Sequence, residues 1–285
     1  MNILVSVNDH YLMPLLVMLT SLFEHCTGEI SIWFMAKSTS EQAIQAVADF
    51  VTAHGARFHM LAVRDDFFSD MPTAKYISKE TYYRLFAAQL LPTEMDRVLW
   101  LDADLVITGD ISPLYNMPLG DHAVGGNGHT GAIYETEMLN CRSLGIEPDK
   151  YINAGVMLMQ LSRWRRRNIR GEISAIISQG YPLNYADQDL VNLIFKEEIA
   201  YFPPEYNFRV RKICSDEDFQ WARENASVLH YCGRMKPWMF TDMPLGDIWM
   251  SYYEKSPYSS RKLHRISSAS LSRLVTRYGD QKDDN

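Results

Sequence analysis

The chain has 285 residues, of which 47% are hydrophobic and 22% charged, a balance that is ordinary for a folded globular protein and excludes a disordered one. A formal net charge of −7 excludes a general nucleic-acid-binding protein, because such proteins carry a basic footprint. The four cysteines lie far apart without C-x-x-C spacing, which favours reduced thiols over disulfides or a thiolate zinc site. The amino terminus lacks a basic secretion signal and no apolar run approaches the roughly 18 to 20 residues of a membrane-spanning helix, so we expect a cytoplasmic protein.

Strands and helices alternate through the first hundred residues. Short apolar runs predict strands, and longer runs with apolar residues at helical spacing predict helices. The expected strands span residues 3–7, 30–36, 57–63 and 98–101, and the expected helices span residues 14–23, 40–54 and 80–91. This alternation predicts an α/β fold with a mostly parallel, doubly wound sheet.

The second half of the chain continues the pattern less regularly. We expect strands over residues 153–159 and 227–231, and a helix that begins at Asp187 and ends near Phe195. Residues 233–238 form a loop rich in polar and rigid residues. Residues 125–130 are rich in glycine and follow a short strand, which predicts a mobile loop that could act as a lid.

The last segment of the chain is basic. Residues 256–285 contain six Lys or Arg residues against three Asp, with apolar residues between the basic ones. This pattern predicts a basic amphipathic helix that can lie on an anionic membrane surface. A solvated terminal helix or a frayed tail is the alternative interpretation.

The fourth strand ends in the sequence Asp102-Ala103-Asp104. The carboxyl ends of strands are where open α/β sheets bind ligands. Because residues i and i+2 of an extended segment point the same way, the two carboxylates can meet at one point if the extended conformation persists through Ala103. Two carboxylates that lie so close together require a bound cation or a shared proton.

A second group of polar residues follows the strand at residues 227–231. His230 ends that strand, and Gly233 and Lys236 come soon after it. Two carboxylates and one imidazole suit Mn²⁺, which also accepts phosphate oxygens. Gly233 would allow a diphosphate to approach the backbone, and Lys236 would offer it a positive charge. A hydrogen-bonded structural histidine is the ordinary interpretation of His230 taken alone.

Six motifs, in order over about residues 1 to 240, resemble those of glycosyltransferase family 8. These motifs are Asn8-Asp9-His10-Tyr11, Glu80-Thr81-Tyr82-Tyr83-Arg84-Leu85, Leu101-Asp102-Ala103-Asp104, Tyr151-Ile152-Asn153-Ala154-Gly155-Val156, Asp187-Gln188-Asp189 and the segment at residues 230–238. The resemblance implies a single nucleotide-diphospho-sugar transferase domain of the A-type, Rossmann-like fold, with a mixed, mostly parallel sheet flanked by helices. We expect this catalytic domain over residues 1–250 and the tail over residues 251–285.

The resemblance also implies roles for individual residues. Asp102, Asp104 and His230 would hold Mn²⁺, with Mg²⁺ as a possible substitute, against the diphosphate of a UDP-sugar. The implied nucleotide-sugar-binding residues are Ser6, Asn8, Tyr11, Arg84, Asp102, Ala103, Asn153, Ala154, Gly233 and Lys236. The implied catalytic residues around the transferred sugar are Gln188, Asp187, Arg84 and Asn153. Several have ordinary interpretations as well, because Asn153 and Asp187 could cap turns or helices and Arg84 could pair with a surface acid.

Family 8 enzymes retain the configuration of the transferred sugar. Retention usually requires a carboxylate nucleophile, but the matching residue is Gln188, an amide that does not ionise. We therefore favour attack by the acceptor hydroxyl on the face that the phosphate leaves, with Asp187 as a transient nucleophile in the alternative mechanism. The implied donor is UDP-galactose or UDP-glucose. The implied acceptor is a glycan or glycolipid of bacterial cell-surface polysaccharide or lipopolysaccharide synthesis, met at the inner face of the membrane.

Two other functions fit parts of the sequence. The run around Asp102 also resembles the first motif of haloacid-dehalogenase-type phosphatases, although in those enzymes it usually lies near the amino terminus. A non-catalytic UDP-sugar-binding protein would keep the fold without turnover. Metal-dependent release of UDP from a UDP-sugar distinguishes the transferase from both.

Overall fold

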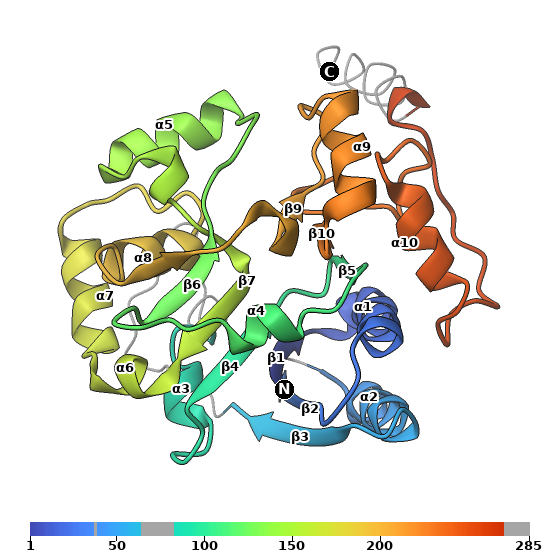
Figure 1. The fold of residues 1–285 in the computed structure, drawn as a ribbon, viewed down its shortest axis with the longest axis horizontal. Helices are drawn as coiled ribbons and strands as arrows, with labels where there is room; N and C mark the ends of the chain where they lie inside the picture. Colours follow the sequence, from blue (N-terminus) through green and yellow to red (C-terminus); the bar gives the residue numbers. More distant parts are fainter. Residues whose placement is uncertain (37–38, 64–82, 271–285) are drawn as a thin grey trace, which may run out of the picture.

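The computed structural model describes residues 1–36, 39–63 and 83–270, with a seven-stranded sheet at the centre (Figure 1). The strand order is β3-β2-β1-β4-β7-β6-β8. These strands are β1 (Asn2–Val7), β2 (Ser31–Ala36), β3 (Arg57–Ala62), β4 (Arg97–Leu101), β6 (Val124–Asn127), β7 (Asn153–Gln160) and β8 (Ile199–Tyr201). Only β7 runs antiparallel to its neighbours, β4 and β6. The expected mixed, mostly parallel sheet is confirmed.

A second, three-stranded sheet lies beside the first. It consists of β5 (Leu105–Ile107), β10 (Val228–His230) and β9 (Phe208–Arg209), in that order. The helices are α1 (Leu12–His25), α2 (Glu41–Ala53), α3 (Ala87–Leu90), α4 (Ser112–Asn116), α5 (Glu135–Leu144), α6 (Leu161–Arg166), α7 (Ile169–Ser178), α8 (Asp187–Ile194), α9 (Asp216–Asn225) and α10 (Gly246–Tyr253). Short 3-10 helices at Asp9–Tyr11, Pro148–Lys150 and Pro204–Tyr206 complete the connections.

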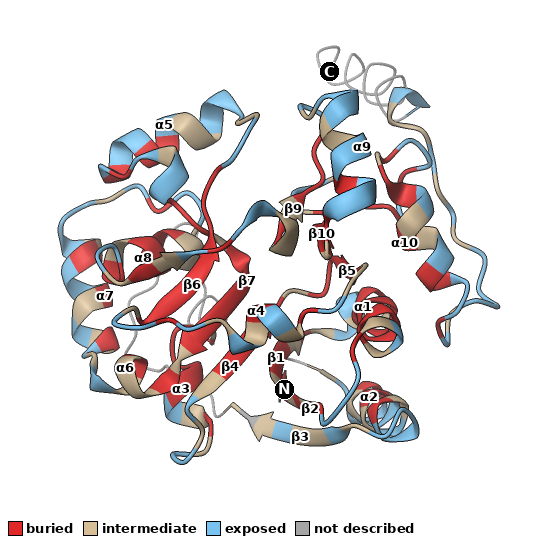
Figure 2. Ribbon diagram, in the orientation of Figure 1, coloured by how far each residue is buried: buried red, intermediate tan, exposed pale blue. Residues whose placement is uncertain are grey.

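Helices cover both faces of the middle of the central sheet, so β1, β4, β7 and β6 are mostly buried, whereas the edge strand β3 is partly exposed (Figure 2). Residues of α3, α6, α7 and α8 pack on one face, and residues of α1, α2 and α4 pack on the other. Strands covered on both sides have continuous apolar sequences, which is why the sequence predicted them well. A third apolar cluster joins α9 and α10 to the small sheet, with Trp249 fully buried in it.

The helix expected over residues 80–91 is shorter in the structure. Residues 80–82 lie outside the described residues, residues 83–86 form turns, and only α3 is helical. The side chains of residues 85–88 are all buried. Their apolar character therefore reflects burial on every side, which periodicity cannot distinguish from one helix face.

The glycine-rich segment at residues 125–130 is packed. Gly125 and Gly126 lie in β6, and residues 125–129 are buried. A Cβ on Gly125 would lie 2.3 Å from the Phe202 ring, and one on Gly128 would lie 2.0 Å from the carbonyl oxygen of Asp149. Close packing, not the expected mobility of a lid, is the reason for these glycines.

The described part of the tail is attached to the domain. The expected boundary at residue 250 falls within α10, whose Tyr252 and Tyr253 are buried. Residues 256–267 are not helical, in contrast to the expected amphipathic helix, and Ile266 forms a bridge with Phe240. Residues 268–270 are helical, and the remainder of the expected helix, residues 271–285, lies outside the described residues. Among the described helices none has the length and apolar character needed to cross a membrane.

Candidate active site

The two acidic residues lie in the turn between β4 and β5. Asp102 N donates a hydrogen bond of 2.9 Å to Gly155 O, which continues the pairing of β4 with β7 by one residue. The chain then turns at Ala103 and Asp104, so the extended conformation through Ala103, under which both carboxylates would point the same way, does not persist. The turn arises because β5 leaves the central sheet to pair with β10.

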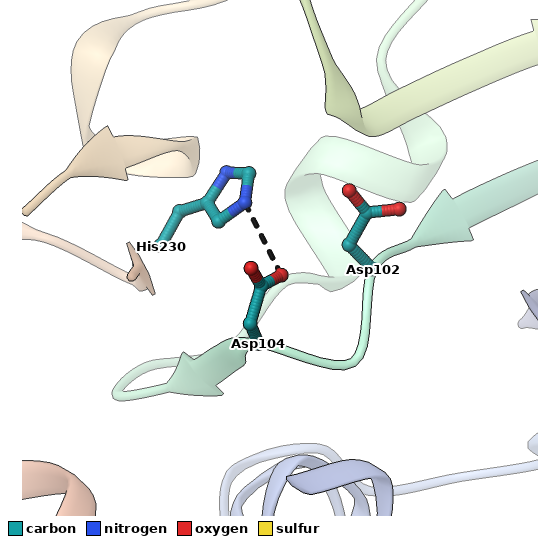
Figure 3. A group of neighbouring side chains, drawn as sticks. All are labelled: Asp102, Asp104 and His230. Carbon is teal, nitrogen blue, oxygen red and sulfur yellow. Dashed lines mark ion pairs between the residues drawn. The ribbon is translucent and has the colours of Figure 1, made fainter. Parts of the chain in front are cut away.

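Strand pairing brings His230 to this acidic turn (Figure 3). In the register of β10 with β5, His230 lies opposite Leu105, and Tyr231 N donates to Asp104 O at 3.0 Å. Nε2 of His230 lies 3.3 Å from Oδ1 of Asp104. One ligand atom from each of Asp102, Asp104 and His230 lies within 4.8 Å of the others. The three residues expected to bind metal therefore come together.

The donor set of this cluster fits a divalent cation. Two carboxylates and an imidazole suit Mn²⁺, and carboxylate-rich sites also accept Mg²⁺. Burial raises the pKa of the Asp104 carboxyl, but His230 and Lys236 beside it hold that pKa far below its usual value. Asp104 is therefore ionised, as a metal ligand must be. Burial raises the pKa of the nearby Cys232 thiol to about 11, and Cys232 is not among the residues whose ligand atoms come together in this cluster.

Lys236 is directed at the acidic turn. Its ammonium group donates to Oδ2 of Asp104 and, at 2.7 Å, to the carbonyl oxygen of Tyr231. An ammonium group has three N–H donors, so one remains for the diphosphate contact that the sequence predicted. Gly233, in the same loop, has a φ of 84°, a conformation that side chains other than glycine rarely adopt.

Arg84 joins the acidic turn to the start of α8. Its guanidinium bonds to Asp187 Oδ2 at 2.5 Å, to Asp102 Oδ1 at 3.1 Å and to the Ala154 carbonyl oxygen at 2.7 Å, and it stacks on the Trp100 ring. Burial raises the pKa of Asp187, and Arg84 partly offsets that rise. Arg84 therefore pairs with two carboxylates of the site and not with a surface acid.

The expected sugar-binding amides bond to each other. Asn153 begins β7, and its Nδ2 donates to Gln188 Oε1 at 2.8 Å. The backbone N–H of Ala154 also donates to Gln188 Oε1, at 3.1 Å. Gln188 Nε2 in turn donates to Tyr151 OH at 3.0 Å. Both ends of the Gln188 amide are thus held by the protein.

The expected uridine-binding residues lie at the carboxyl end of β1. Ser6 Oγ donates to Met35 O at 3.0 Å, and Asn8 Oδ1 accepts from His10 N at 3.1 Å, so Asn8 caps the 3-10 helix. The Tyr11 ring is 38% exposed and lies edge-on to Trp238, with ring centroids 6.0 Å apart. Tyr11 therefore has a free face near the loop that carries Lys236.

A cavity of about 460 Å³ opens beside the acidic turn. Of the described residues predicted for the site, Asp102, Asp104, Asn153, Gln188, His230 and Gly233 line it. The other predicted residues are not among its lining residues: Ser6, Asn8, Tyr11, Arg84, Ala103, Ala154, Asp187 and Lys236. The candidate metal ligands and the expected sugar-binding amides therefore share one cavity, and the expected uridine-binding residues lie outside it.

Several residues of the site were not predicted. Gly155 packs against His230, Asn207 bonds to His230 Nδ1 at 2.9 Å, and Tyr134, Tyr185 and Arg209 line the cavity. Gly155 lies within the motif at residues 151–156, so the sequence did contain an indication that it belongs to the site. No motif marks Asn207 in the sequence. It lies in an irregular segment after the Tyr201–Pro204 break, and only the tertiary structure brings it to His230.

Comparisons with known proteins show which family the chain resembles. The family model described as Glycosyl transferase family 8 matches residues 2–242. The lipopolysaccharide 1,2-glucosyltransferase of Escherichia coli K12 is 27% identical over 252 residues, which cover 84% of this chain and 72% of the relative. General stress protein A of Bacillus subtilis is 22% identical over 276 residues, with 91% and 95% covered.

The fold agrees with a solved structure as well. The galactosyltransferase LgtC, in complex with donor and acceptor sugar analogues, is 27% identical. The two chains superpose with a TM-score of 0.73 over 90% of this chain and 96% of LgtC. This similarity confirms the expected A-type fold.

Proposed function

Since this chain belongs to glycosyltransferase family 8, we propose that it is a Mn²⁺-dependent, retaining hexosyltransferase. It would move glucose or galactose from UDP to a hydroxyl group of a glycan or glycolipid. The observation that carries this proposal is the cluster of Asp102, Asp104 and His230, whose ligand atoms lie within 4.8 Å of one another in a cavity lined by sugar-binding amides.

Departure of UDP develops negative charge on the diphosphate. Mn²⁺ held by Asp102, Asp104 and His230 would supply Lewis-acid stabilisation of that charge. Lys236 would add a hydrogen bond from its remaining N–H, at the edge of the same carboxylate cluster. Gly233, at positive φ, leaves the backbone of the loop accessible to phosphate oxygens.

The bonding of Gln188 supports attack by the acceptor hydroxyl on the face that the phosphate leaves. Gln188 Oε1 already accepts two hydrogen bonds, from Asn153 Nδ2 and Ala154 N, so its lone pairs are engaged. Asp187 bonds to Arg84, which lowers the nucleophilicity of its carboxylate. These residues would orient the sugar, and a departing phosphate oxygen would accept the proton of the attacking hydroxyl.

The acceptor would enter through the remainder of the cavity. Tyr134 and Tyr185 line it and are 38% and 37% exposed, which suits stacking on the apolar face of a sugar ring. Polar groups of Glu137 and Lys212 also line the cavity and can bond to hydroxyl groups. A glycan acceptor fits this mixture of aromatic and polar walls. The lipopolysaccharide glucosyltransferase among the relatives supports an acceptor of the bacterial cell surface.

We further propose peripheral contact with the inner face of the membrane through the tail. Arg261 and Lys262 are exposed in its described part. The test is sedimentation of the full chain with vesicles of anionic lipid, compared with the double variant Arg261→Glu, Lys262→Glu. Equal sedimentation with neutral and anionic vesicles would contradict the membrane role and leave the transferase proposal intact.

The transferase test is a panel of UDP-sugars with the full chain and Mn²⁺. We expect UDP release with UDP-glucose or UDP-galactose, its loss in EDTA, and a product whose anomeric configuration matches the donor. Acceptor trials then use the donor that is hydrolysed. The absence of metal-dependent UDP release with every UDP-hexose would contradict the proposal. Calorimetric binding of a UDP-sugar without turnover would favour a non-catalytic binding protein, and hydrolysis of p-nitrophenyl phosphate would favour the phosphatase.

A further inference from the structure

The imidazole of His230 has a different partner at each nitrogen. Nε2 lies 3.3 Å from Oδ1 of Asp104, at the metal cluster, and Nδ1 lies 2.9 Å from Oδ1 of Asn207. The ring is 2% exposed, so solvent does not compete for either nitrogen. Which nitrogen carries the proton decides whether His230 presents a lone pair to a cation. The orientation of the Asn207 amide is therefore decisive.

A backbone group fixes that orientation. Gly155 N–H, which can only donate, lies 3.1 Å from Asn153 Oδ1, so this atom of Asn153 is the acceptor. Asn207 Nδ2 then donates to the same oxygen at 3.0 Å. The oxygen of the Asn207 amide is left facing Nδ1 of His230. Because a carbonyl oxygen only accepts, Nδ1 must carry hydrogen.

A second backbone N–H fixes the orientation of the Gln188 amide, the next member of this series of hydrogen bonds. Ala154 N–H donates to Gln188 Oε1 at 3.1 Å, and Asn153 Nδ2 donates to the same oxygen at 2.8 Å. Gln188 Nε2 donates to Tyr151 OH at 3.0 Å. Tyr151 OH donates in turn to Asp189 Oδ1 at 2.5 Å. Every hydrogen bond in this series is therefore donated in the same direction, from His230 toward the buried carboxylate of Asp189.

Asp189, the last residue of this series of hydrogen bonds, is itself held in place. Asp189 is fully buried and also accepts from Asn140 Nδ2 at 2.8 Å and from the Tyr185 N–H at 2.7 Å. Burial raises the pKa of the Tyr151 hydroxyl well above its usual value, so Tyr151 keeps its proton and donates it. Asp189 therefore accepts the last hydrogen bond of the series.

We infer that Asn207 is a positioning residue that holds His230 as the Nδ1–H tautomer, so that the Nε2 lone pair faces the cation site. The orientation is set by the Gly155 and Ala154 N–H groups of β7 through Asn153. Without Asn207, Nε2 would carry the hydrogen and donate it to Asp104 Oδ1, and a cation would have to displace that proton. The inference rests on the proposed function only in that the cation is Mn²⁺.

The first test is nitrogen NMR of protein labelled with ¹⁵N-histidine, recorded without metal at pH 8. The His230 signals are assigned by their absence in His230→Asn. We expect Nδ1 in the protonated range in the wild type, whether or not Nε2 also holds a proton toward Asp104 while the metal is absent. A spectrum with Nε2 protonated and Nδ1 unprotonated would overturn the inference without any further variant.

The second test compares variants at residue 207. Asn207→Ala removes the acceptor, and we expect His230 to change to the Nε2–H tautomer and the dissociation constant of Mn²⁺, measured by electron paramagnetic resonance, to rise about 10- to 100-fold. Asn207→Asp keeps an acceptor at Nδ1 and should keep the wild-type tautomer and affinity. Asn168→Ala removes an asparagine outside this network, which accepts from Gly171 N and caps α7, and should leave the His230 signals unchanged.

The outcomes separate the two proposals. An Nδ1–H signal that persists in Asn207→Ala would overturn the role of Asn207. If Asn207→Ala does not fold, loss of the Nδ1–H signal in Asn207→Asp would do so. UDP release with an Nε2–H wild type would contradict this inference alone. The expected tautomer without UDP release from any sugar would contradict the proposed function alone.

Discussion

The backbone of Gly155 packs directly on the imidazole of His230. A Cβ built on Gly155 would lie 2.2 Å from Cε1 of His230 and 3.0 Å from Oδ2 of Asp102. No side chain larger than hydrogen fits between β7 and this ring. The absence of a side chain at Gly155 is therefore a requirement of the metal cluster.

We expect Gly155→Ala to displace His230 and to weaken Mn²⁺ binding at least about 10-fold. Overpacking should also lower the free energy of unfolding by about 1–3 kcal/mol. The matched control is Gly126→Ala in β6, where a Cβ would meet Ile152 Cδ1 at 2.9 Å and no proposed metal ligand. Titration of both variants with Mn²⁺ checks the prediction, and equal affinities would contradict it.

Arg84 holds two carboxylates in one orientation, so we expect Arg84→Lys to lower kcat/KM at least about 10-fold. A lysine is a point charge and cannot bond to Asp187, Asp102 and Ala154 O together. Arg84→Met should lower the free energy of unfolding by about 3 kcal/mol, because two carboxylates lose their partner. Steady-state kinetics and urea denaturation measure the two effects.

The control for Arg84 is Arg167→Lys. Arg167 also bonds to two carboxylates, those of Glu172 and Glu198, but it is more exposed, and neither of these carboxylates lines the cavity, whereas Asp102 beside Arg84 does. We expect a change in unfolding free energy below about 1 kcal/mol and unchanged turnover. If both arginine variants had the same effect on kcat/KM, Arg84 would have no special role in the site.

His129 makes stability depend on pH. Burial, with Arg209 and Arg211 nearby, lowers the pKa of His129 to about 3, and its Nδ1 accepts from Arg209. The unfolded chain takes up a proton at this histidine below its ordinary pKa of about 6.5, whereas the folded protein does not. His129 therefore costs stability as the pH falls from about 6.5 toward 3, by about 2 kcal/mol at pH 5.

We expect His129→Asn to remove that contribution, because its Oδ1 can accept from Arg209 without titrating. The measurement is the difference in unfolding free energy between pH 7 and pH 5, which should be smaller in the variant by about 2 kcal/mol. An identical difference in both proteins would show that His129 is not responsible.

Asp104→Asn should lower metal-dependent UDP release by more than about 100-fold, because the site loses a charged ligand worth several kcal/mol in the transition state. Retained Mn²⁺ affinity and turnover close to the wild type would remove Asp104 from the metal site. Urea denaturation shows whether the loss has a structural origin, since Lys236 also loses its carboxylate partner.

Asn8→Asp should be tolerated. An aspartate can accept the same hydrogen bond from His10 N and cap the 3-10 helix, so we expect the free energy of unfolding to change by less than about 0.5 kcal/mol. A charged acceptor for the uracil N–H should leave the KM for the UDP-sugar equal or lower. A rise in KM of more than tenfold would contradict a contact between residue 8 and the base.

Sequence periodicity predicted the strands well and some other segments poorly. The runs at residues 3–7 and 153–159 are strands because both faces of the sheet are covered, which makes them continuously apolar. The same reasoning failed at residues 85 and 86, which form turns before α3 and whose burial imitates a helix face. It also failed at Gly125 and Gly128, because a glycine that permits close packing has the same sequence as one that permits motion.

The sequence by itself determined which chemical groups the site contains, since the ligand types, the amides and the strand that ends at Asp102 are all local features. Only the tertiary structure decided that His230 lies beside Asp104, 126 residues away in sequence, because β10 pairs with β5. It also decided that Asn207 and Gly155 fix the imidazole. Strand pairing and hydrogen-bond direction depend on residues distant in sequence, and no local pattern records them.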